Sequence, residues 1–338
     1  MVFGATVFSV SRHRPSVVGT DTTANEVWAY PEDSAFADAV PFRRAAEIVD
    51  AGSRIIGPFP YRKIAHVESS TRYGGMENSS AIFYDQGGYV SRRMVEGVVR
   101  HQTAHQWFGD AVTERDWRHL WLSEGFASYF DLVIGAALDG DSLLQQGMRA
   151  SAAGYFGSRN VDRPLVDSAA HDLMGLLNAN SYNKGAWLLH MLRWEVGDWA
   201  FFRGVREYYR IFPDSSVLSE DCQRVVERAA GRDLGWFFRQ WLYQPGYPPQ
   251  LAVDLRVDRA ARTATLRVRQ AQPAAWGRFR LPRVEVRFFA AGDSVGEGTF
   301  ALDAAQEEQT FSFTLARVPT EARLDPDGHL LMRATVEH

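Results

Sequence analysis

Cysteine is nearly absent from this chain of 338 residues, since Cys222 is its only one. An internal disulfide is therefore excluded, which favours a reducing, cytoplasmic location and leaves export of a disulfide-free protein open. Long apolar runs are also missing: no stretch of about 18 consecutive apolar residues occurs, so we expect a soluble chain without a membrane span. The short apolar opening lacks the features of a signal peptide. We interpret it as a strand in a chain that starts inside a longer protein.

Excess positive charge is lacking as well. The formal net charge is -4 at pH 7 with neutral histidines, which argues against a nucleic-acid partner. The hydrophobic fraction of 46% and the charged fraction of 23% are those of an ordinary soluble globular protein. At roughly 100 to 200 residues per domain, the length predicts about two domains.

The spacing of the apolar residues changes near residue 250. From about residue 35 to 245 they recur at helical spacing, whereas after the prolines of "LYQPGYPPQ" they alternate with polar residues. Short alternating strands between turns predict a small β-sandwich. The chain is therefore predicted to be α+β, mainly helical over residues 35–249 and a β-sandwich over residues 250–338.

Two histidines four positions apart stand in "RHQTAHQWFGD". Several residues around them follow one another at steps of four and three, so they share one face of a predicted helix with Ser91 as its N-cap. These residues are Met94, Val98, His101, His105 and Phe108. Both imidazoles then point the same way. An H-x-x-x-H pair alone is weak evidence for a metal, because core and surface histidines are common at that spacing.

A third metal ligand is available in "LWLSEGFASYFD". Glu124 follows His105 by 19 positions, which leaves room for a turn and the start of a second helix. Two imidazoles and one carboxylate make a catalytic type of zinc site with a fourth position open. Glu124 is equally well explained as a charge in the first turn of a helix, where the helix dipole favours it. Residue spacing does not decide between these interpretations.

The stretch "HQTAHQWFGDAVTERDWRHLWLSEGFASYFD" resembles the signature of the zinc aminopeptidases related to aminopeptidase N, which are gluzincins with a thermolysin-like catalytic domain. Two further segments occur in the family's order. "YGGMENSSAIFY" is similar to its G-x-M-E-N exopeptidase loop, and "SYNKGAWLLHMLR" is similar to the segment with its catalytic tyrosine. The resemblance implies a thermolysin-like catalytic domain over residues 35–249 and a remnant of the family's N-terminal β-domain over residues 1–34.

The resemblance also implies a role for each matched residue. His101, His105 and Glu124 would bind one zinc ion per chain, which lowers the pKa of its water to about 7 and polarises the peptide carbonyl. The hydroxyl of Tyr182 would donate a hydrogen bond to the oxyanion. Without the family pattern, Tyr182 would be interpreted as packing at the start of a helix.

The G-x-M-E-N segment would bind the substrate. Its residues are Gly74, Gly75, Met76, Glu77 and Asn78. The Glu77 carboxylate would pair with the free α-ammonium of the peptide, and the backbone of the two glycines would pair with the peptide as an added strand. As an alternative, Glu77 is a solvated loop charge.

One residue departs from the pattern at the position of the general base. In H-E-x-x-H zinc peptidases the residue after the first histidine is the glutamate that takes a proton from zinc-bound water. Here that residue is Gln102, an amide with no usable basicity, and Arg100 is an unusual neighbour for the motif. The family's large N-terminal β-domain is also nearly absent.

Two functions are compatible with these residues. The first is a zinc aminopeptidase, a metallopeptidase that removes N-terminal residues from peptides, impaired by Gln102. The second is a catalytically dead zinc-binding pseudopeptidase that acts as a peptide-binding module, and hydrolysis of an epoxide is a weaker alternative. The expected partner in either case is a peptide with a free N-terminus. The oligomeric state and the preferred N-terminal residue do not follow from the sequence.

Overall fold

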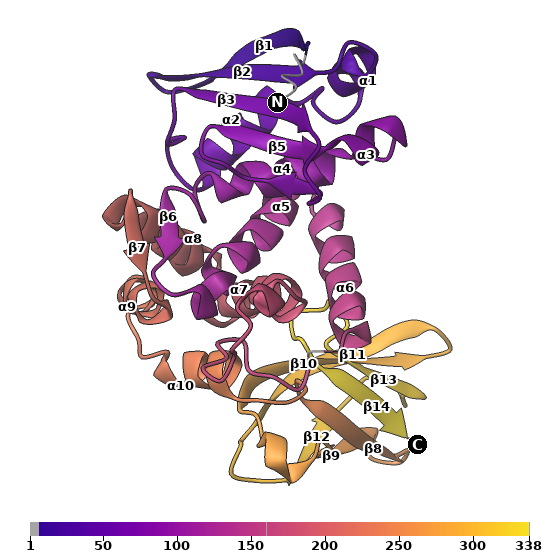
Figure 1. Cartoon of the computed structure of the whole chain (residues 1–338). Coiled ribbons are helices and arrows are strands. Elements are labelled where there is room, and N and C mark those ends of the chain that lie inside the picture. The colour runs from indigo at the N-terminus through magenta and orange to yellow at the C-terminus, as the bar shows by residue number, and fades with distance from the viewer. Residues whose placement is uncertain (1–6, 160, 338) are drawn as a thin grey trace.

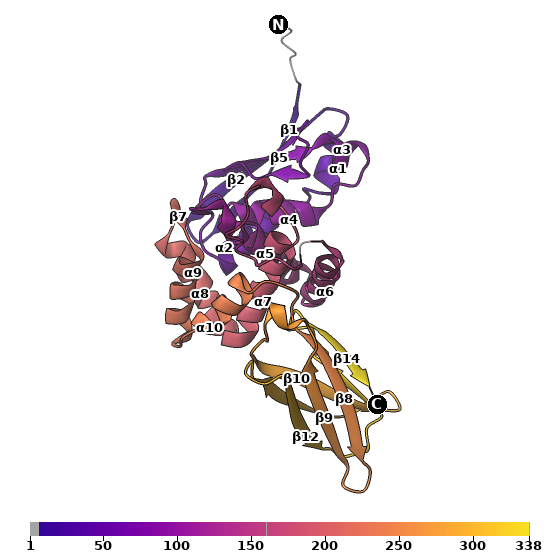
Figure 2. The same ribbon diagram turned by 60° about the horizontal axis from the view of Figure 1, so that its bottom comes forward.

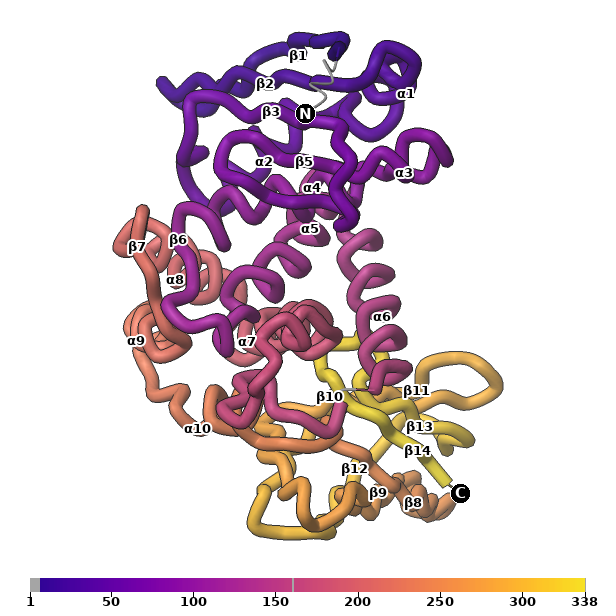
Figure 3. The backbone as a smooth tube through the Cα atoms, viewed as in Figure 1, coloured from indigo at the N-terminus to yellow at the C-terminus, as the bar shows by residue number. Residues whose placement is uncertain are grey.

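The computed structural model describes residues 7–159 and 161–337 of the chain (Figure 1). A mixed sheet lies at one end, a group of helices lies in the middle, and two further sheets lie at the other end. The backbone trace shows the same arrangement from indigo to yellow (Figure 3). The predicted α+β class is confirmed.

The first sheet has five strands in the order β1-β2-β3-β5-β4. They are β1 (Ser9–Val18), β2 (Asp21–Ala29), β3 (Lys63–Ser69), β4 (Gly75–Met76) and β5 (Ala81–Asp85). Strands β2, β3 and β5 are parallel, whereas β1 and β4 are antiparallel edge strands. Its helices are α1 (Ser34–Ala39), α2 (Ala45–Ile55) and α3 (Gln86–Val90).

The boundary predicted between residues 34 and 35 divides this continuous sheet, because β1 pairs with β2, and β2 pairs with β3 of the following segment. The opening of the chain does contribute the strand β1 from Ser9 onward, whereas residues 1–6 lie outside the described residues. The assignment of residues 1–34 to a remnant of another domain stays a prediction.

The middle of the chain is helical, as its apolar spacing predicts. The helices that frame the site are α4 (Glu96–His105), α5 (Glu124–Asp139), α6 (Ser142–Gly157) and α7 (Gly185–Val196). The others are α8 (Asp198–Ile211), α9 (Ser219–Ala230) and α10 (Gly235–Phe238). Shorter elements are the 3₁₀ helices η1 (Trp117–Leu122) and η2 (Met174–Leu176), the π-helices η3 (Asn180–Lys184) and η4 (Arg239–Tyr243), and the paired strands β6 (Val112–Glu114) and β7 (Ser215–Val217). Among the described residues, no helix combines the length and apolarity needed to cross a membrane.

The predicted N-cap of the histidine helix is wrong. Helix α4 begins at Glu96, and Ser91 instead ends α3, where its hydroxyl donates to the carbonyl of Gly87 at 2.6 Å. The physical reason is the backbone of Arg92, whose φ of 57° lies in the left-handed region and interrupts a helical path between the two helices.

The C-terminal part consists of two facing sheets (Figure 2). One sheet contains β12 (Glu308–Thr314), β9 (Thr263–Gln270), β8 (Gln250–Asp258) and β14 (Arg333–Glu337). The other contains β11 (Asp293–Leu302), β10 (Leu281–Ala290) and β13 (Glu321–Leu324), and the short 3₁₀ helix η5 (Ala274–Trp276) precedes β10. Aromatic rings join the sheets, with centroids 4.5 Å apart for Phe300 and Phe311 and 5.3 Å apart for Phe288 and Phe313. The alternating strands therefore bury their apolar faces against each other, as in a β-sandwich.

Helix α5 is the central helix of the middle part, since it packs against α4, α6 and α7. Its closest approach to α7 is at two glycines. A Cβ atom on Gly125 would lie 2.8 Å from the Cα of Gly185, and a Cβ on Gly185 would lie 2.8 Å from the Cα of Gly125. Only residues without a side chain allow this backbone contact. It places Glu124 of α5 beside the turn that carries Tyr182.

We predict that Gly185→Ala destabilises the protein by about 1–3 kcal/mol, because the added methyl group overpacks the contact between α5 and α7. Urea denaturation of the purified chain measures this change. Gly157→Ala is the matched control, since a Cβ there meets nothing within 4 Å and the substitution should be neutral or slightly stabilising. Equal stability of the two variants would contradict the interpretation.

Candidate metal centre and peptide-binding loop

Three side chains converge where α4 meets α5. His101 and His105 lie one turn apart on α4, and Glu124 is the first residue of α5. The Nε2 atoms of the two imidazoles are 3.1 Å apart, and Oε2 of Glu124 lies 3.4 Å from His101 Nε2 and 3.2 Å from His105 Nε2. All three ligand atoms lie within 4.8 Å of one another. The structure thus brings the three residues singled out in the sequence into one cluster.

Hydrogen bonding orients His105 toward this cluster. Its ring is 1% exposed, and Nδ1 lies 3.2 Å from the carbonyl oxygen of Phe108. Because a carbonyl only accepts, Nδ1 carries the proton and donates it, which leaves Nε2 as the atom that faces Glu124. A metal ion binds that nitrogen in its unprotonated form.

The electrostatics of the cluster favour a cation. Burial lowers the pKa of His105, but Glu124 raises it more, and the result is a pKa of about 9. Burial raises the pKa of Glu124, but His105 and His101 lower it by more than burial raises it. The pKa of Glu124 therefore lies well below its usual range. Among the described residues, the buried Oε2 atom of Glu124 has only the two imidazoles as ion-pair partners. Two nitrogen donors and one carboxylate in this arrangement fit a zinc ion, which would replace the proton.

The hydroxyl of Tyr182 contacts the same carboxylate, that of Glu124. It lies in the π-helix η3, directly before α7, and its hydroxyl donates to Oε1 of Glu124 at 2.7 Å. Its ring lies 6.1 Å from the ring of His101. Burial and then the nearby Glu124 charge raise the pKa of Tyr182 above its usual value, so the hydroxyl keeps its proton at neutral pH.

Gln102 lies between the cluster and the edge strand β4. The residue is 6% exposed, and among the described residues its Oε1 atom has no hydrogen-bond partner. A Cβ on Gly75 would lie 2.6 Å from Cδ of Gln102, so the strand runs directly over this amide. Strand β4 ends the sheet order, so one of its edges has no neighbouring strand among the described residues.

Gln106 holds the loop that follows β4, a role that the sequence analysis missed. The residue is fully buried, its Oε1 accepts from the backbone N–H of Ser80 at 2.7 Å, and its Nε2 donates to the Glu77 carbonyl at 2.8 Å. Its Nε2 also donates to Oδ2 of Asp110 at 2.7 Å, and burial raises the pKa of Asp110 to about 7. Gln106 follows Gln102 by one helical turn. This spacing in the sequence was the available indication that both amides lie on the same face of the helix.

The structure places the predicted loop residues beside the cluster. Glu77 is half-buried, and its charge contributes to the raised pKa values of His105 and Tyr182. Gly74, Met76 and Asn78 are exposed. The loop therefore brings one carboxylate near the ligands and leaves its neighbours open to solvent.

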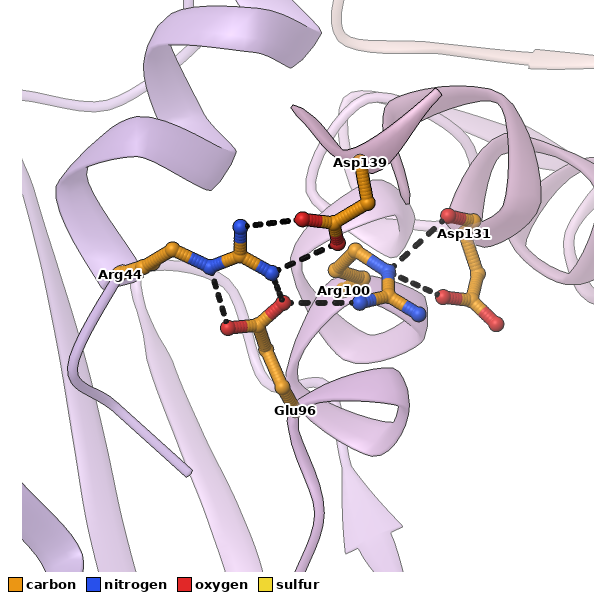
Figure 4. Close-up of polar contacts among 5 residues, drawn as sticks. All are labelled: Arg44, Glu96, Arg100, Asp131 and Asp139. Atoms are coloured by element: carbon orange, nitrogen blue, oxygen red, sulfur yellow. Dashed lines mark hydrogen bonds and ion pairs between the residues drawn. The ribbon is translucent and has the colours of Figure 1, made fainter. Parts of the chain in front are cut away.

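A network of five charged residues fixes the outer side of α4 (Figure 4). Arg44 pairs with Glu96 and Asp139, with its closest atoms at 2.7 Å from each carboxylate. Arg100 pairs with Glu96 at 2.8 Å and, through Nε, with Oδ1 of Asp131 at 2.8 Å. These pairs link α4 to α5 and to the residue before α2. Arg100, the unusual neighbour of His101 in the motif, thus belongs to the framework of the site.

Comparison with known proteins shows which family this chain belongs to. The model of the peptidase family M1 domain matches residues 45–241, and the chain belongs to this family. Among curated relatives, aminopeptidase N of Lactococcus lactis subsp. lactis is 32% identical over 190 residues, which cover 52% of this chain and 22% of the relative. Probable aminopeptidase 1 of Sulfurisphaera tokodaii is 30% identical over 190 residues, 52% of this chain and 24% of the relative. The chain thus spans about a quarter of the length of these relatives. The resemblance stated from the sequence is confirmed.

Solved structures share the fold. The chain resembles aminopeptidase A of Legionella pneumophila, in complex with aspartic acid, with a TM-score of 0.80 and 18% identity over 98% of this chain and 38% of that one. A glutamate-to-alanine mutant of an M1 zinc metallopeptidase from Deinococcus radiodurans matches with a TM-score of 0.62 and 27% identity over 72% of this chain and 53% of that one.

We expect Gln106→Leu to destabilise the protein by about 1–3 kcal/mol, because it leaves buried hydrogen-bonding groups unpaired. Hydrogen exchange of the amides of residues 75–80 should become faster, since the loop loses its main connection to α4. The control is Gln146→Leu, an exposed glutamine of α6. Unchanged exchange in the loop would show that Gln106 does not hold it.

Proposed function

We propose that this chain is the catalytic part of a zinc aminopeptidase whose turnover is slowed by Gln102. The observation that carries the proposal is the convergence of His101, His105 and Glu124, with ligand atoms within 4.8 Å of one another and the Tyr182 hydroxyl on the same carboxylate. Membership of peptidase family M1 and the names of the relatives support the reaction class.

In this proposal the three ligands hold one zinc ion in an open site. Zinc bound there would lower the pKa of a coordinated water to about 7 and polarise the peptide carbonyl. The Tyr182 hydroxyl is protonated, and the half-buried side chain lies beside the ligands, so it can donate to the negative charge that develops on the carbonyl oxygen. Such a donor in a water-excluded site typically contributes about 3–4 kcal/mol to the barrier reduction.

The loop after β4 would bind the amino end of the peptide. Glu77 supplies a carboxylate for the α-ammonium, and Gln106 fixes its backbone. The free edge of β4 would accept the peptide backbone as an added strand. A peptide held in this way exposes only its first peptide bond to the ligands. The Deinococcus radiodurans mutant was also solved with a Tyr-Ser-Ala substrate, at 29% identity to this chain and a TM-score of 0.60, which supports a peptide as ligand.

Three carboxylates described around the site are committed elsewhere and do not replace the base at Gln102. Glu124 faces the two imidazoles, Asp131 is paired with Arg100, and Glu77 lies on the loop for the amine. The alternative function is therefore a pseudopeptidase that binds zinc and peptides without cleaving them. Both functions use the same ligands and the same loop, and turnover distinguishes them.

We predict about one equivalent of zinc per chain despite Gln102, because the amide is not a ligand and the three ligand side chains are present. Elemental analysis after dialysis against a weak chelator measures the stoichiometry. His105→Ala should lose most of the zinc. A chain without zinc, or one whose zinc survives His105→Ala, would refute the assignment.

We predict that Gln102→Glu raises kcat by about two to four orders of magnitude with little change in KM, since general acid-base help is used mainly in the transition state. Aminoacyl-anilide hydrolysis by the zinc-loaded chain provides the measurement. The isosteric exchange should preserve helix α4 and peptide binding. If the variant binds peptides but is no faster, the chain is a pseudopeptidase.

A further inference from the structure

Two carboxylic acids are buried together at one side of the first sheet. Glu68 on β3 is 0% exposed, and Asp33, in the turn that follows β2, is 3% exposed. Their side chains lie within hydrogen-bonding reach of each other. Two ionised carboxylates only accept hydrogen bonds, so a bond between them requires that one of the two carries a proton.

The other contacts of this carboxyl pair join three segments of the chain. Oε2 of Glu68 accepts from the backbone N–H of Tyr30 at 2.9 Å, which ties the turn after β2 to β3. Oδ1 of Asp33 accepts from Nη1 of Arg92 at 2.6 Å, and Arg92 lies between α3 and α4. Oε1 of Glu68 is buried and has no hydrogen-bond partner among the described residues. A proton on this oxygen turns it from an unpaired acceptor into a donor.

The charges around the carboxyl pair favour retention of one proton. Among the described residues, Arg92 is the only cation paired with it, and one half-exposed guanidinium offsets at most one of the two negative charges. Burial raises the pKa of Glu68 most, the N–H of Tyr30 lowers it, and the charges of Asp33 and Glu32 raise it again, to about 7. Two carboxyl groups that share one site ordinarily keep a proton in this way.

The other ionisable groups on this face of the sheet stay neutral. His66 lies two residues before Glu68 on the same face of β3, and burial lowers the pKa of His66 to about 3. Burial raises the pKa of Tyr84 on β5 and of Tyr89 on α3, so both phenols keep their protons at neutral pH. The buried side chains of β2 carry no ionisable group. Among the described residues of this face, the ionisation that changes near neutral pH is therefore that of the carboxyl pair.

We propose that Glu68 and Asp33 share one proton, and that this proton holds the turn after β2 and the junction of α3 and α4 on β3, so that the first sheet responds to pH. When the proton leaves, two negative charges face each other in a buried contact with one arginine, and the contact loosens. The pair lies in the row of the sheet that ends at the peptide edge, because Glu68 is opposite Tyr84 of β5 and Tyr84 is opposite Gly75 of β4. This pH response does not depend on zinc or on turnover.

The sign of the effect follows from the raised pKa. An unfolded glutamate has a pKa of about 4.3, so between about pH 4 and pH 7 the folded chain retains a proton that the unfolded chain has released. The stability that the carboxyl pair contributes is therefore fully present below about pH 4 and is lost as the pH rises through about 7.

The first measurement is a carbon-13 NMR titration of the side-chain carboxyl groups in the full chain. Glu68→Gln and Asp33→Asn assign the two signals, since each variant removes one of them. One proton of the pair should be lost within about one unit of pH 7. If both carboxyl groups titrate below about pH 5, where unperturbed carboxyl groups do, the shared proton is refuted.

The second measurement is urea denaturation of the wild-type chain and of Glu68→Gln at pH 6 and pH 8. The amide of the variant can accept from Tyr30 and donate to Asp33 at either pH, so its midpoint should rise relative to the wild type as the pH increases. Asp110, whose pKa burial also raises to about 7, contributes equally to both chains and cancels in this difference.

Glu307→Gln is the matched control, because this side chain of the β-sandwich is 63% exposed. Its midpoint relative to the wild type should be the same at the two pH values. A Glu68→Gln difference that also does not change with pH would overturn the proposal.

Discussion

The close backbone contact of α5 and α7 at Gly125 and Gly185 is the constraint on which the candidate site depends. Glu124 precedes Gly125 in the chain, and Tyr182 lies one turn before Gly185, so the contact brings the carboxylate and the hydroxyl to 2.7 Å. On its other side α5 packs against α4 and its two histidines. Helix α4 thus supplies two imidazoles, α5 a carboxylate and η3 a hydroxyl to a common point, and the positions of these groups follow from how closely the helices pack.

The charges around this point are arranged in two layers. Close to the ligands, a buried carboxylate faces two imidazoles, a combination that retains a proton or a metal ion. Behind them, Arg44 and Arg100 neutralise most of the charge of three carboxylates and connect α4 to α5 (Figure 4). These ion pairs therefore fix α4 and α5 relative to each other, and their side chains are partly shielded from water. A neutral residue at position 102 leaves this framework intact, because Gln102 takes no part in these ion pairs.

Much of the fold follows from local patterns, and the exceptions have physical causes. The helical spacing up to residue 245 and the alternation after residue 250 predict the change from helices to a β-sandwich. Serine is a residue type that is preferred at N-caps, yet Ser91 does not cap the histidine helix. The left-handed backbone at Arg92 ends one helix before the next begins. The strands β1 and β2 precede the predicted boundary at residues 34 and 35, and the pairing of β2 with β3 joins both segments in one sheet. Strand pairing is a long-range interaction, so it leaves no mark in the periodicity of either segment.

For the candidate site, the sequence by itself determined the residue types: two histidines one turn apart, a glutamate at the start of a helix, a tyrosine, a glycine-rich loop and an amide at the base position. Helix geometry was sufficient to place His101 and His105 together, because that contact is local. Only the tertiary structure decided that Glu124 reaches both imidazoles and that Gln106 holds the Glu77 loop. These contacts join segments tens of residues apart, or different faces of packed helices, and their distances depend on how the whole core packs rather than on any one segment.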